Sequence, residues 1–351
     1  MKIAYIVPSL IRSGPIKVVH QLVEALQKEH DVEVYYFKIP QREKLKFDAP
    51  VHCIDFREVI DFDAYDIIHS HTILADAYVW YHRKKIHKAK TVTTLHNYAK
   101  EDLVFSYGKI KAFWMVKVWE LVTSKHDRVV VLSKDAVKYY KKFWRNQNLT
   151  YVYNGVAPIQ IKETPSVETD AAVKIGVIAS AGGISRRKGI DQVIKVLAGL
   201  PGHMLFIAGK ETGESEVLKD LAHSLGVDDR VKFMGYCSDM DGFISDMDIF
   251  VIPSRSEGLP LSLLEIASAK KAIVCSDIPI FKEVMKSGEV KFFALEDIES
   301  LKHAIEEVDL KRELYADKAY EAYIANYTTK KMAENYLKVY KTLLKADKDE
   351  K

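Results

Sequence analysis

The chain has 351 residues, of which 48% are hydrophobic and 29% are charged, with a formal net charge of +3. This composition is ordinary for a soluble globular protein, the length suits two domains, and no apolar stretch is long enough to be a membrane-spanning helix. Three widely separated cysteines, Cys53, Cys237 and Cys275, indicate neither a disulfide framework nor a zinc cluster, and a reducing cytoplasm fits best.

Positive charge is concentrated in the first half of the chain. Residues 1–160 carry 25 Lys and Arg against 17 Asp and Glu, a net of +8, whereas the remainder carries 27 against 32, a net of −5. This asymmetry predicts an anionic ligand or an anionic surface on one side of the protein.

Apolar runs alternate with helical patterns through the first half. Residues 2–7 end at Pro8, which predicts a first strand and not a secretory signal. A loop containing Gly14 follows, and Pro15 is well placed to open a helix from Ile16 to Gln27. Further strands are predicted at residues 31–37, 65–69, 90–95, 128–132 and 149–153.

Three histidines fall at predicted strand ends. His69 and His71 close one strand, and His96 follows the strand at residues 91–95. The i, i+2 spacing of the first two fits a metal pair, but no third ligand is evident, so they are interpreted as structural or cleft-lining residues. A lone histidine is more often structural than functional, which leaves the role of His96 open on this pattern alone.

Basic and aromatic residues crowd two segments of the first half, 81–90 and 107–120. The second segment carries Lys109, Lys111, Trp114, Lys117 and Trp119 in a helical pattern. Such segments can dock on anionic lipid, with the rings at the level of the headgroups. Packed helices with solvated lysines are the alternative. No nucleic-acid reader motif accompanies them, so a nucleic-acid partner is not expected.

The second half repeats the alternation of strands and helices. A polar stretch at 160–170 predicts a linker between an N-terminal domain at 1–159 and a second domain at 171–326. Strands are predicted at residues 173–179, 203–208, 230–234, 248–252 and 272–275. This pattern predicts two Rossmann-like α/β domains with parallel sheets covered on both faces.

A basic loop joins the strand at 173–179 to an apolar helix. It carries Arg186, Arg187 and Lys188 close to glycines, and three cations before a helix N-terminus suit a diphosphate. A solvated basic loop is the alternative, although a position at a strand end argues against it.

Asp-x-Asp occurs at residues 61–63, 239–241 and 246–248. Some transferases hold a metal ion on a diphosphate with such a pair. Here turns and a strand start surround the aspartates, so capping and solvation are expected and no required metal is predicted, because cations and helix dipoles can stabilise the diphosphate.

Residues 253–265 carry the most specific pattern. Glu257 lies in a turn with Gly258, Leu259 and Pro260, and Glu265 lies in the apolar helix that Leu261 and its successors begin. Strand, glycine-containing turn and helix aim backbone N–H groups at an anion, and a carboxylate on each side supplies acceptors for hydroxyl groups. A sugar nucleotide carries both hydroxyls and phosphates.

This segment resembles the signature of the retaining glycosyltransferases of family 4, two Glu residues eight positions apart around Gly-x-Pro. The resemblance covers nearly the whole chain and implies the GT-B fold, two Rossmann-like domains facing a cleft. In that fold a C-terminal helix returns to the first domain. Residues 327–351 are expected to form it, with Tyr336, Val339, Tyr340 and Leu343 on one stripe.

The resemblance also implies roles for individual residues. Glu265 would bind ribose and Glu257 a donor-sugar hydroxyl, while the amides of residues 258–261 would meet the diphosphate. Lys188 matches the family's Lys-Gly pair, but Gly182 stands where the family has Arg, so Arg186 or Arg187 would replace it.

Three other positions match the family. His96, in a Thr-x-His context, would face the donor sugar. Gly14 remains from the family's glycine pair in the first loop, and Tyr236 lies where relatives bind the nucleotide base.

The expected activity is that of a cytoplasmic, metal-independent hexosyltransferase that retains anomeric configuration. It would move sugar from a nucleotide diphosphate sugar, expected to be a UDP-sugar, to a lipid-linked glycan or polysaccharide precursor, with no other cofactor. Peripheral contact with an anionic membrane would come through the N-terminal domain. A non-hydrolysing sugar-nucleotide epimerase and a non-catalytic nucleotide-sugar-binding protein remain alternatives.

Overall fold

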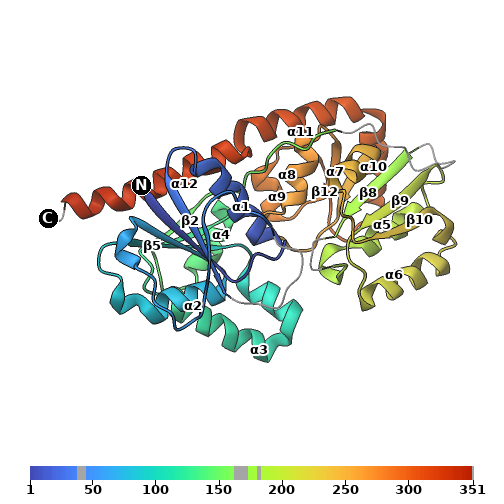
Figure 1. Ribbon diagram of the computed structural model, residues 1–351. Coiled ribbons are helices and arrows are strands. Elements are labelled where there is room, and N and C mark those ends of the chain that lie inside the picture. Colours follow the sequence, from blue (N-terminus) through green and yellow to red (C-terminus); the bar gives the residue numbers. More distant parts are fainter. Residues whose placement is uncertain (38–44, 162–172, 180–182, 350–351) are drawn as a thin grey trace. The chain divides into compact units, whose positions relative to one another are not determined.

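The computed structural model describes residues 1–37, 45–161, 173–179 and 183–349 (Figure 1). The chain divides into two compact units, a first unit of Met1–Gly155 with Thr329–Lys351 and a second unit of Val156–Thr328. Residues 162–170 of the predicted linker lie outside the described residues. None of the described helices is long and apolar enough to cross a membrane.

The first unit is built on a parallel sheet, which in the described part has seven strands in the order β3-β2-β1-β4-β5-β6-β7. The strands are β1 Lys2–Val7, β2 Asp31–Phe37, β3 Val51–Ile54, β4 Ile67–His71, β5 Lys90–Leu95, β6 Arg128–Val131 and β7 Leu149–Tyr151. The helices are α1 Gly14–Leu26, α2 Ile73–His82, α3 Ala99–Thr123, α4 Lys134–Lys141 and α12 Thr329–Asp349. Short 3-10 helices span Phe62–Ala64 and Arg83–Lys85.

The C-terminal helix α12 belongs to the first unit, although the whole second unit lies between α12 and the rest of the first unit in sequence (Figure 1). Tyr336 and Tyr340 on the predicted stripe are fully buried, and the hydroxyl of Tyr340 lies 2.9 Å from that of Tyr5 on β1. The expected return of the C-terminal helix to the first domain is confirmed.

The second unit has a parallel sheet with six described strands in the order β10-β9-β8-β11-β12-β13. The strands are β8 Val173–Ile178, β9 His203–Ala208, β10 Val231–Gly235, β11 Ile249–Ile252, β12 Ala272–Ser276 and β13 Lys291–Phe293. The helices are α5 Ile190–Leu197, α6 Gly213–Ser224, α7 Met240–Asp246, α8 Leu261–Ser268, α9 Pro279–Val284, α10 Ile298–Leu310 and α11 Arg312–Asn326. Short 3-10 helices span Arg186–Lys188 and Asp228–Arg230.

The predicted α/β class with two Rossmann-like parallel sheets is confirmed, and the errors are local. The edge strands β3 and β13 are missing from the prediction, because they are only four and three residues long and only partly buried. Strand β4 covers Ile67–His71 and not 65–69, because buried His69 and Ser70 find hydrogen-bond partners and let the strand continue.

Each sheet reverses its strand order at one point. In the first unit this point lies between β1 and β4, and in the second unit between β8 and β11. Loops that follow neighbouring strands on either side of such a point diverge and leave room for a ligand at the carboxyl ends of the strands. The basic loop follows β8 and the Glu257 turn follows β11, so the topology brings these two predicted elements together.

Candidate active site

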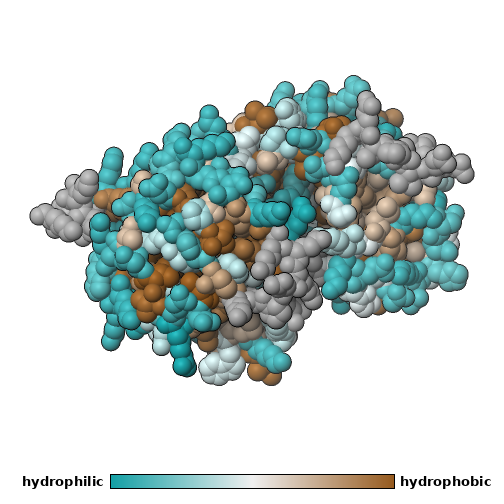
Figure 2. All heavy atoms as spheres, viewed as in Figure 1, coloured by the Kyte–Doolittle hydropathy of each residue, from teal (hydrophilic) through white to brown (hydrophobic). Residues whose placement is uncertain are grey.

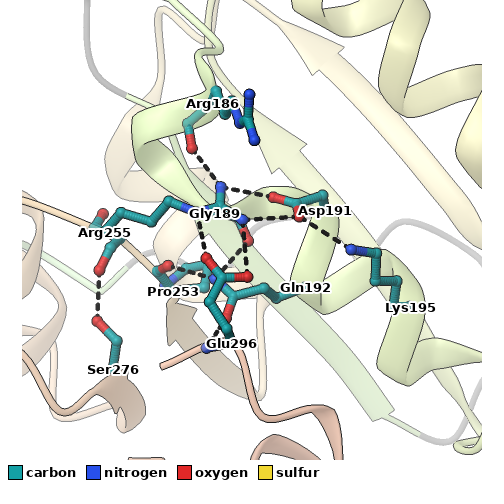
Figure 3. Close-up of polar contacts among 10 residues, drawn as sticks. Arg186, Gly189, Asp191, Gln192, Lys195, Pro253, Arg255, Ser276 and Glu296 are labelled. Atoms are coloured by element: carbon teal, nitrogen blue, oxygen red, sulfur yellow. Dashed lines mark hydrogen bonds and ion pairs between the residues drawn. The ribbon is translucent and has the colours of Figure 1, made fainter. Parts of the chain in front are cut away.

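The loops after β8 and β11 are joined through backbone contacts at Gly189. This residue has φ +67°, and a Cβ atom there would lie 2.0 Å from the carbonyl oxygen of Pro253. The amide nitrogen Nε2 of Gln192 donates to the same carbonyl at 3.0 Å (Figure 3). Because only glycine allows this approach without strain, the basic loop is held against the turn that carries Glu257.

Arg255 also joins the same two loops. Its guanidinium makes two 2.9 Å bonds to the carboxylate of Asp191 on α5, and it also pairs with Glu296 (Figure 3). The backbone N–H of Arg255 donates to the carbonyl of Arg187 at 2.8 Å. Bidentate arginine–carboxylate pairs fix geometry as well as charge, so the neighbouring cations are held in defined positions.

Glu257 lies at the centre of the arrangement, between two cations. Its Oε1 accepts from Nζ of Lys188 at 2.8 Å and from Oγ of Ser254 at 2.8 Å. Its Oε2 lies 2.9 Å from Nη1 of Arg187, which also donates to the carbonyl of Ser256 at 2.6 Å. Glu257 is 8% exposed and Lys188 is 5% exposed, so this ion pair is largely withdrawn from water.

The protonation of Glu257 follows from its neighbours. Burial by itself raises the pKa of a carboxyl group, but Lys188 and Arg187 outweigh this effect and lower the pKa of Glu257 to about 2. The carboxylate is therefore charged at neutral pH and can only accept hydrogen bonds. Lys188, Arg187 and Glu257 together carry one net positive charge, which suits a diphosphate.

The turn leads directly into α8. Gly258, Leu259 and Pro260 connect Glu257 to the first helical residue, Leu261, and Glu265 lies one turn into the helix with 6% exposure. The positive end of the helix dipole thus lies beside the paired cations. The segment places anion-binding groups and two carboxylates within nine residues, as the sequence pattern predicts.

His96 lies in the first unit, directly after β5. Burial lowers the pKa of His96 to about 4, so its ring is neutral at pH 7. Its Nε2 lies 2.9 Å from Nδ1 of His71, the last residue of β4. His69 is also buried, bonded to Tyr340 and Thr94, in agreement with the structural interpretation of that residue.

The structure brings three of the predicted residues of the second unit into direct contact. Arg187, Lys188 and Glu257 make direct contact. The side chain of Arg186 is exposed, and Tyr236 is 56% exposed after β10. Gly14 is the first residue of α1, in the other unit, and a Cβ atom added there would have no described atom within 4 Å.

Sequence reasoning missed three residues of the second unit's arrangement, Ser254, Arg255 and Gln192, which hold the two loops and the Glu257 carboxylate. In the first unit it named His71 as structural or cleft-lining, but not its bond to His96. Ser254 and Arg255 lie inside the segment that the pattern singled out, but roles were assigned there only to Glu257, Glu265 and the amides of residues 258–261. A buried glutamine in a helix carries no sequence signal that separates it from a surface one.

The Asp-x-Asp pairs have structural contacts. Asp239 accepts from the N–H of Gly242 at the start of α7, Asp63 accepts from those of His87 and Lys88, and Asp248 accepts from that of Lys174. Among the residues that the structure describes, no three His, Cys, Asp or Glu side chains form a group that could hold a metal ion.

Comparison with known proteins decides the family. The family model of the glycosyl transferases group 1 matches residues 166–325, and that of glycosyltransferase family 4 matches residues 13–159. The O-antigen biosynthesis glycosyltransferase WclY of Escherichia coli is 30% identical over 98% of this chain and 99% of its own length. The chain belongs to the glycosyltransferases of family 4. The resemblance seen in residues 253–265 is thereby confirmed for the family.

Solved structures agree with the GT-B architecture of this glycosyltransferase. A sucrose-phosphate synthase from Thermosynechococcus elongatus superimposes with a TM-score of 0.80 at 16% identity, covering 99% of this chain and 100% of that one. HepE of Anabaena, solved in complex with UDP and glucose, has a TM-score of 0.78 at 16% identity, covering 97% and 99%. At these identities the likeness concerns the fold.

Proposed function

We propose that this glycosyltransferase moves a hexose from a UDP-sugar to a lipid-linked glycan or polysaccharide precursor, with retention of anomeric configuration and without a required metal. The observation that carries the proposal is the buried Glu257 held between Lys188 and Arg187 at the start of α8. The relative named for O-antigen biosynthesis supports the acceptor class, and the HepE structures with UDP and UDP-glucose support the donor class.

The donor diphosphate binds against Lys188, Arg187 and the amides of residues 258–261. Arg187 rather than Arg186 replaces the family's missing arginine, because its guanidinium already lies beside the carboxylate that Lys188 contacts. The phosphates compete with Glu257 for these cations and free one carboxylate oxygen. That oxygen then accepts a hydrogen bond from a hydroxyl of the donor sugar, while the carboxylate of Glu265 accepts hydrogen bonds from the ribose hydroxyls.

The remaining assigned residues complete the donor site. Tyr236 stacks on the base, Gly14 lets backbone approach the substrate, and His96 hydrogen-bonds a hydroxyl of the donor sugar. In the transfer, the bond from the anomeric carbon to the diphosphate oxygen breaks and a bond to the acceptor oxygen forms on the same face. The departing diphosphate oxygen takes the acceptor's proton, so no protein nucleophile is required. Paired cations and helix dipole stabilise the charge that develops on the diphosphate.

Two experiments test the donor and the chemistry. UDP-sugars, GDP-sugars and ADP-sugars are screened for the rise in melting temperature of the protein, which identifies the bound donor. Glu257→Gln and Lys188→Ala are then assayed for transfer, with exposed Glu216→Gln and Lys195→Ala as matched controls. Both site variants lose transfer and both controls keep it. Full turnover in both site variants contradicts the proposed roles.

The same assays separate the alternatives. A non-hydrolysing epimerase converts the donor to its epimer without an acceptor, whereas the proposed transferase releases UDP only as acceptor is consumed. A non-catalytic binding protein shows the melting shift and neither product. Analysis of the new glycosidic bond by NMR decides whether the anomeric configuration is retained, and activity in the presence of a chelator decides the metal requirement.

We further propose that the first unit docks at the cytoplasmic face on an anionic membrane, where a lipid-linked acceptor is presented. The described side chains of helix α3 include large apolar ones that are exposed at helical spacing: Ile110, Phe113, Trp114, Val118 and Leu121. Ile110 is 80% exposed and Trp114 66% exposed. Figure 2 shows hydrophobic surface in the region of the first unit where α2 and α3 run.

The charges on this segment favour an anionic lipid surface. Lys109, Lys111 and Lys117 are exposed along α3, whereas Glu120, the acidic residue within 109–121, is buried and paired with Lys117 and Arg145. Exposed aromatic and aliphatic side chains flanked by lysines suit the interface between lipid tails and anionic headgroups.

Vesicle sedimentation tests the docking proposal. The protein binds vesicles of phosphatidylglycerol and not of phosphatidylcholine, and a double change Phe113→Ser and Trp114→Ser weakens binding about tenfold or more, since each buried ring contributes on the order of 1 kcal/mol or more. Leu310→Ser, at an 86% exposed position of the second unit, is the matched control and leaves binding unchanged. Equal binding by the double variant contradicts the assignment to α3.

A further inference from the structure

A row of buried polar side chains lies on one face of the first unit's sheet, under helix α12. Nδ1 of His69 lies 2.7 Å from the hydroxyl of Tyr340, and Nε2 of His69 lies 2.8 Å from Oγ1 of Thr94. Two further hydroxyls belong to the row. That of Tyr5 lies 2.9 Å from the hydroxyl of Tyr340, and that of Tyr336 lies 3.0 Å from Oγ1 of Thr94. Both ring nitrogens of His69 therefore have partners.

His71 occupies the next place in the row and differs from His69. Its Nδ1 lies 2.9 Å from Nε2 of His96, but its own Nε2 is buried and has no hydrogen-bond partner among the described residues. The rings of His69 and His71 lie 4.2 Å apart. His71 is fully buried, whereas His96 is 9% exposed, so His96 is the member of the pair that borders the surface of the unit.

Each ring of this pair carries a single proton at neutral pH. Burial lowers the pKa of His71 well below its usual range, and the neighbouring His69 and His96 lower it further. Burial also lowers the pKa of His96. Two neutral rings joined by one hydrogen bond have two arrangements, because either ring can be the donor.

The two arrangements differ in what remains at the buried end of His71. If His96 donates, the proton of His71 is on Nε2, and a buried N–H group has no acceptor among the described residues. If His71 donates from Nδ1, its Nε2 is a bare acceptor. Orphaned buried N–H groups are rarer in proteins than under-satisfied acceptors, so the second arrangement is favoured.

We propose that His71 is a positioning residue whose Nδ1–H donates to Nε2 of His96 and thereby keeps the proton of His96 on Nδ1. The ring of His96 then offers a hydrogen-bond donor at Nδ1 and no free acceptor, because its Nε2 is occupied. This inference rests on the proposed role of His96 toward the donor sugar. It adds that His96 donates to a sugar oxygen and does not accept from a sugar hydroxyl.

The tautomer is measured without reference to activity. In protein labelled with ¹⁵N-histidine, long-range proton–nitrogen correlation spectra distinguish a protonated ring nitrogen from a bare one, and His96→Gln identifies the signals of residue 96. The expected result is a protonated Nδ1 and a bare Nε2 on His96. A protonated Nε2 on His96 overturns the proposal.

Two variants of nearly the same shape separate a positioning role from a structural one. His71→Asn keeps an N–H donor near the place of Nδ1, whereas His71→Leu removes it. The Nδ1–H preference of His96 persists in His71→Asn and is lost in His71→Leu. For transfer, kcat falls about tenfold in His71→Leu, as expected for one lost hydrogen bond, and stays near the wild-type value in His71→Asn.

The two proposals fail in different ways. If His96→Gln keeps full transfer, the proposed role of His96 is wrong, although the tautomer assignment stands on the spectra. If His71→Leu keeps the Nδ1–H signal of His96, the positioning role is wrong even where His96 is required. The rise in melting temperature with UDP checks that the second unit of each variant is intact, and the wild-type spectrum decides the tautomer if His71→Leu does not fold.

Discussion

The two units bury polar side chains at strand ends in opposite ways. In the second unit, Glu257 keeps its charge in a site of 8% exposure because Lys188 and Arg187 lie within 2.9 Å of its oxygens. In the first unit, His71 and His96 lose their charge on burial, and one hydrogen bond joins the neutral rings. At these two sites, burial is compensated by charge pairing in the second unit and by neutrality in the first.

The difference has a consequence for how each site fails. Removing one member of a buried ion pair leaves an uncompensated charge, which costs far more than the loss of one neutral hydrogen bond. The Glu257 cluster is therefore expected to be sensitive in stability as well as in activity. At the histidine pair, loss of the single hydrogen bond is expected to change the orientation of the rings more than the stability of the protein.

The largest effect is expected from Lys188→Met. It leaves Glu257 buried with only Arg187 beside it as a cation, and the free energy of unfolding falls by about 3 kcal/mol, the usual cost of breaking a buried pair. Urea denaturation followed by circular dichroism measures the loss. In a Glu257→Gln background the same change costs much less, because no charge is stranded. Additive losses in the double variant contradict the pairing argument.

The second prediction concerns the pH at which His96 in the first unit and Glu257 in the second unit stop contributing to stability. The pKa of His96 falls from an ordinary 6.5 to about 4, so the unfolded chain takes up a proton first. This contribution to stability is complete above pH 6.5 and is lost as the pH falls toward 4. The pKa of Glu257 falls from 4.5 to about 2, so its contribution persists until the pH falls below 4.5 and is lost toward 2.

Tryptophan fluorescence detects the first of these transitions selectively. All four tryptophans, Trp80, Trp114, Trp119 and Trp144, belong to the first unit. Between pH 6.5 and 4, the urea midpoint seen by fluorescence falls, because the lowered pKa of His96 reduces the unfolding free energy by up to a few kcal/mol. The circular dichroism transition reports both units and shifts less over this range, because the second unit contributes through partly buried His203, whose pKa is also lowered by burial. It shifts further below pH 4.5, where Glu257 takes up its proton. Equal shifts by both probes from pH 6.5 downward contradict the contrast.

A smaller effect tests the polar row under α12. Tyr340→Phe removes a hydroxyl that bonds both Tyr5 and His69, whereas Tyr336→Phe removes one that bonds Thr94. Urea denaturation should show losses of about 2 and about 1 kcal/mol, in proportion to the buried partners left unsatisfied. Equal losses in the two variants would contradict the argument that stability falls with the number of buried partners left unsatisfied.

The two parallel-sheet domains and the donor-site segment were predictable in outline, because apolar runs locate the strands and a local pattern marks the segment. Glu257 and Lys188 are recognisable within short segments, and the parallel topology brings those segments together. The contact of Arg187 with Glu257 joins residues seventy positions apart, and nothing local distinguishes Arg187 from Arg186.

His69 and His71 show that a sequence pattern does not reveal the hydrogen-bond partners of buried side chains. His69 and His71 follow the same strand pattern, but His69 is bonded at both nitrogens, whereas the Nε2 of His71 has no partner among the described residues. The difference arises in part from Tyr340, which is 271 positions from His69 in sequence and bonds its Nδ1. Long-range partners of buried polar groups are set by packing, so periodicity cannot reveal them.

The smallest expected effect concerns Gly14, the first residue of α1. A Cβ atom added there has no described neighbour within 4 Å, so Gly14→Ala should raise the unfolding free energy by about 0.5 kcal/mol by restricting the unfolded chain. Gly213 is the first residue of α6 and is equally open, which makes Gly213→Ala a matched control. If substrate approaches the backbone at Gly14, only Gly14→Ala raises the KM, while both variants gain stability. An unchanged KM in both would remove Gly14 from the site and leave substrate binding in the first unit to His96.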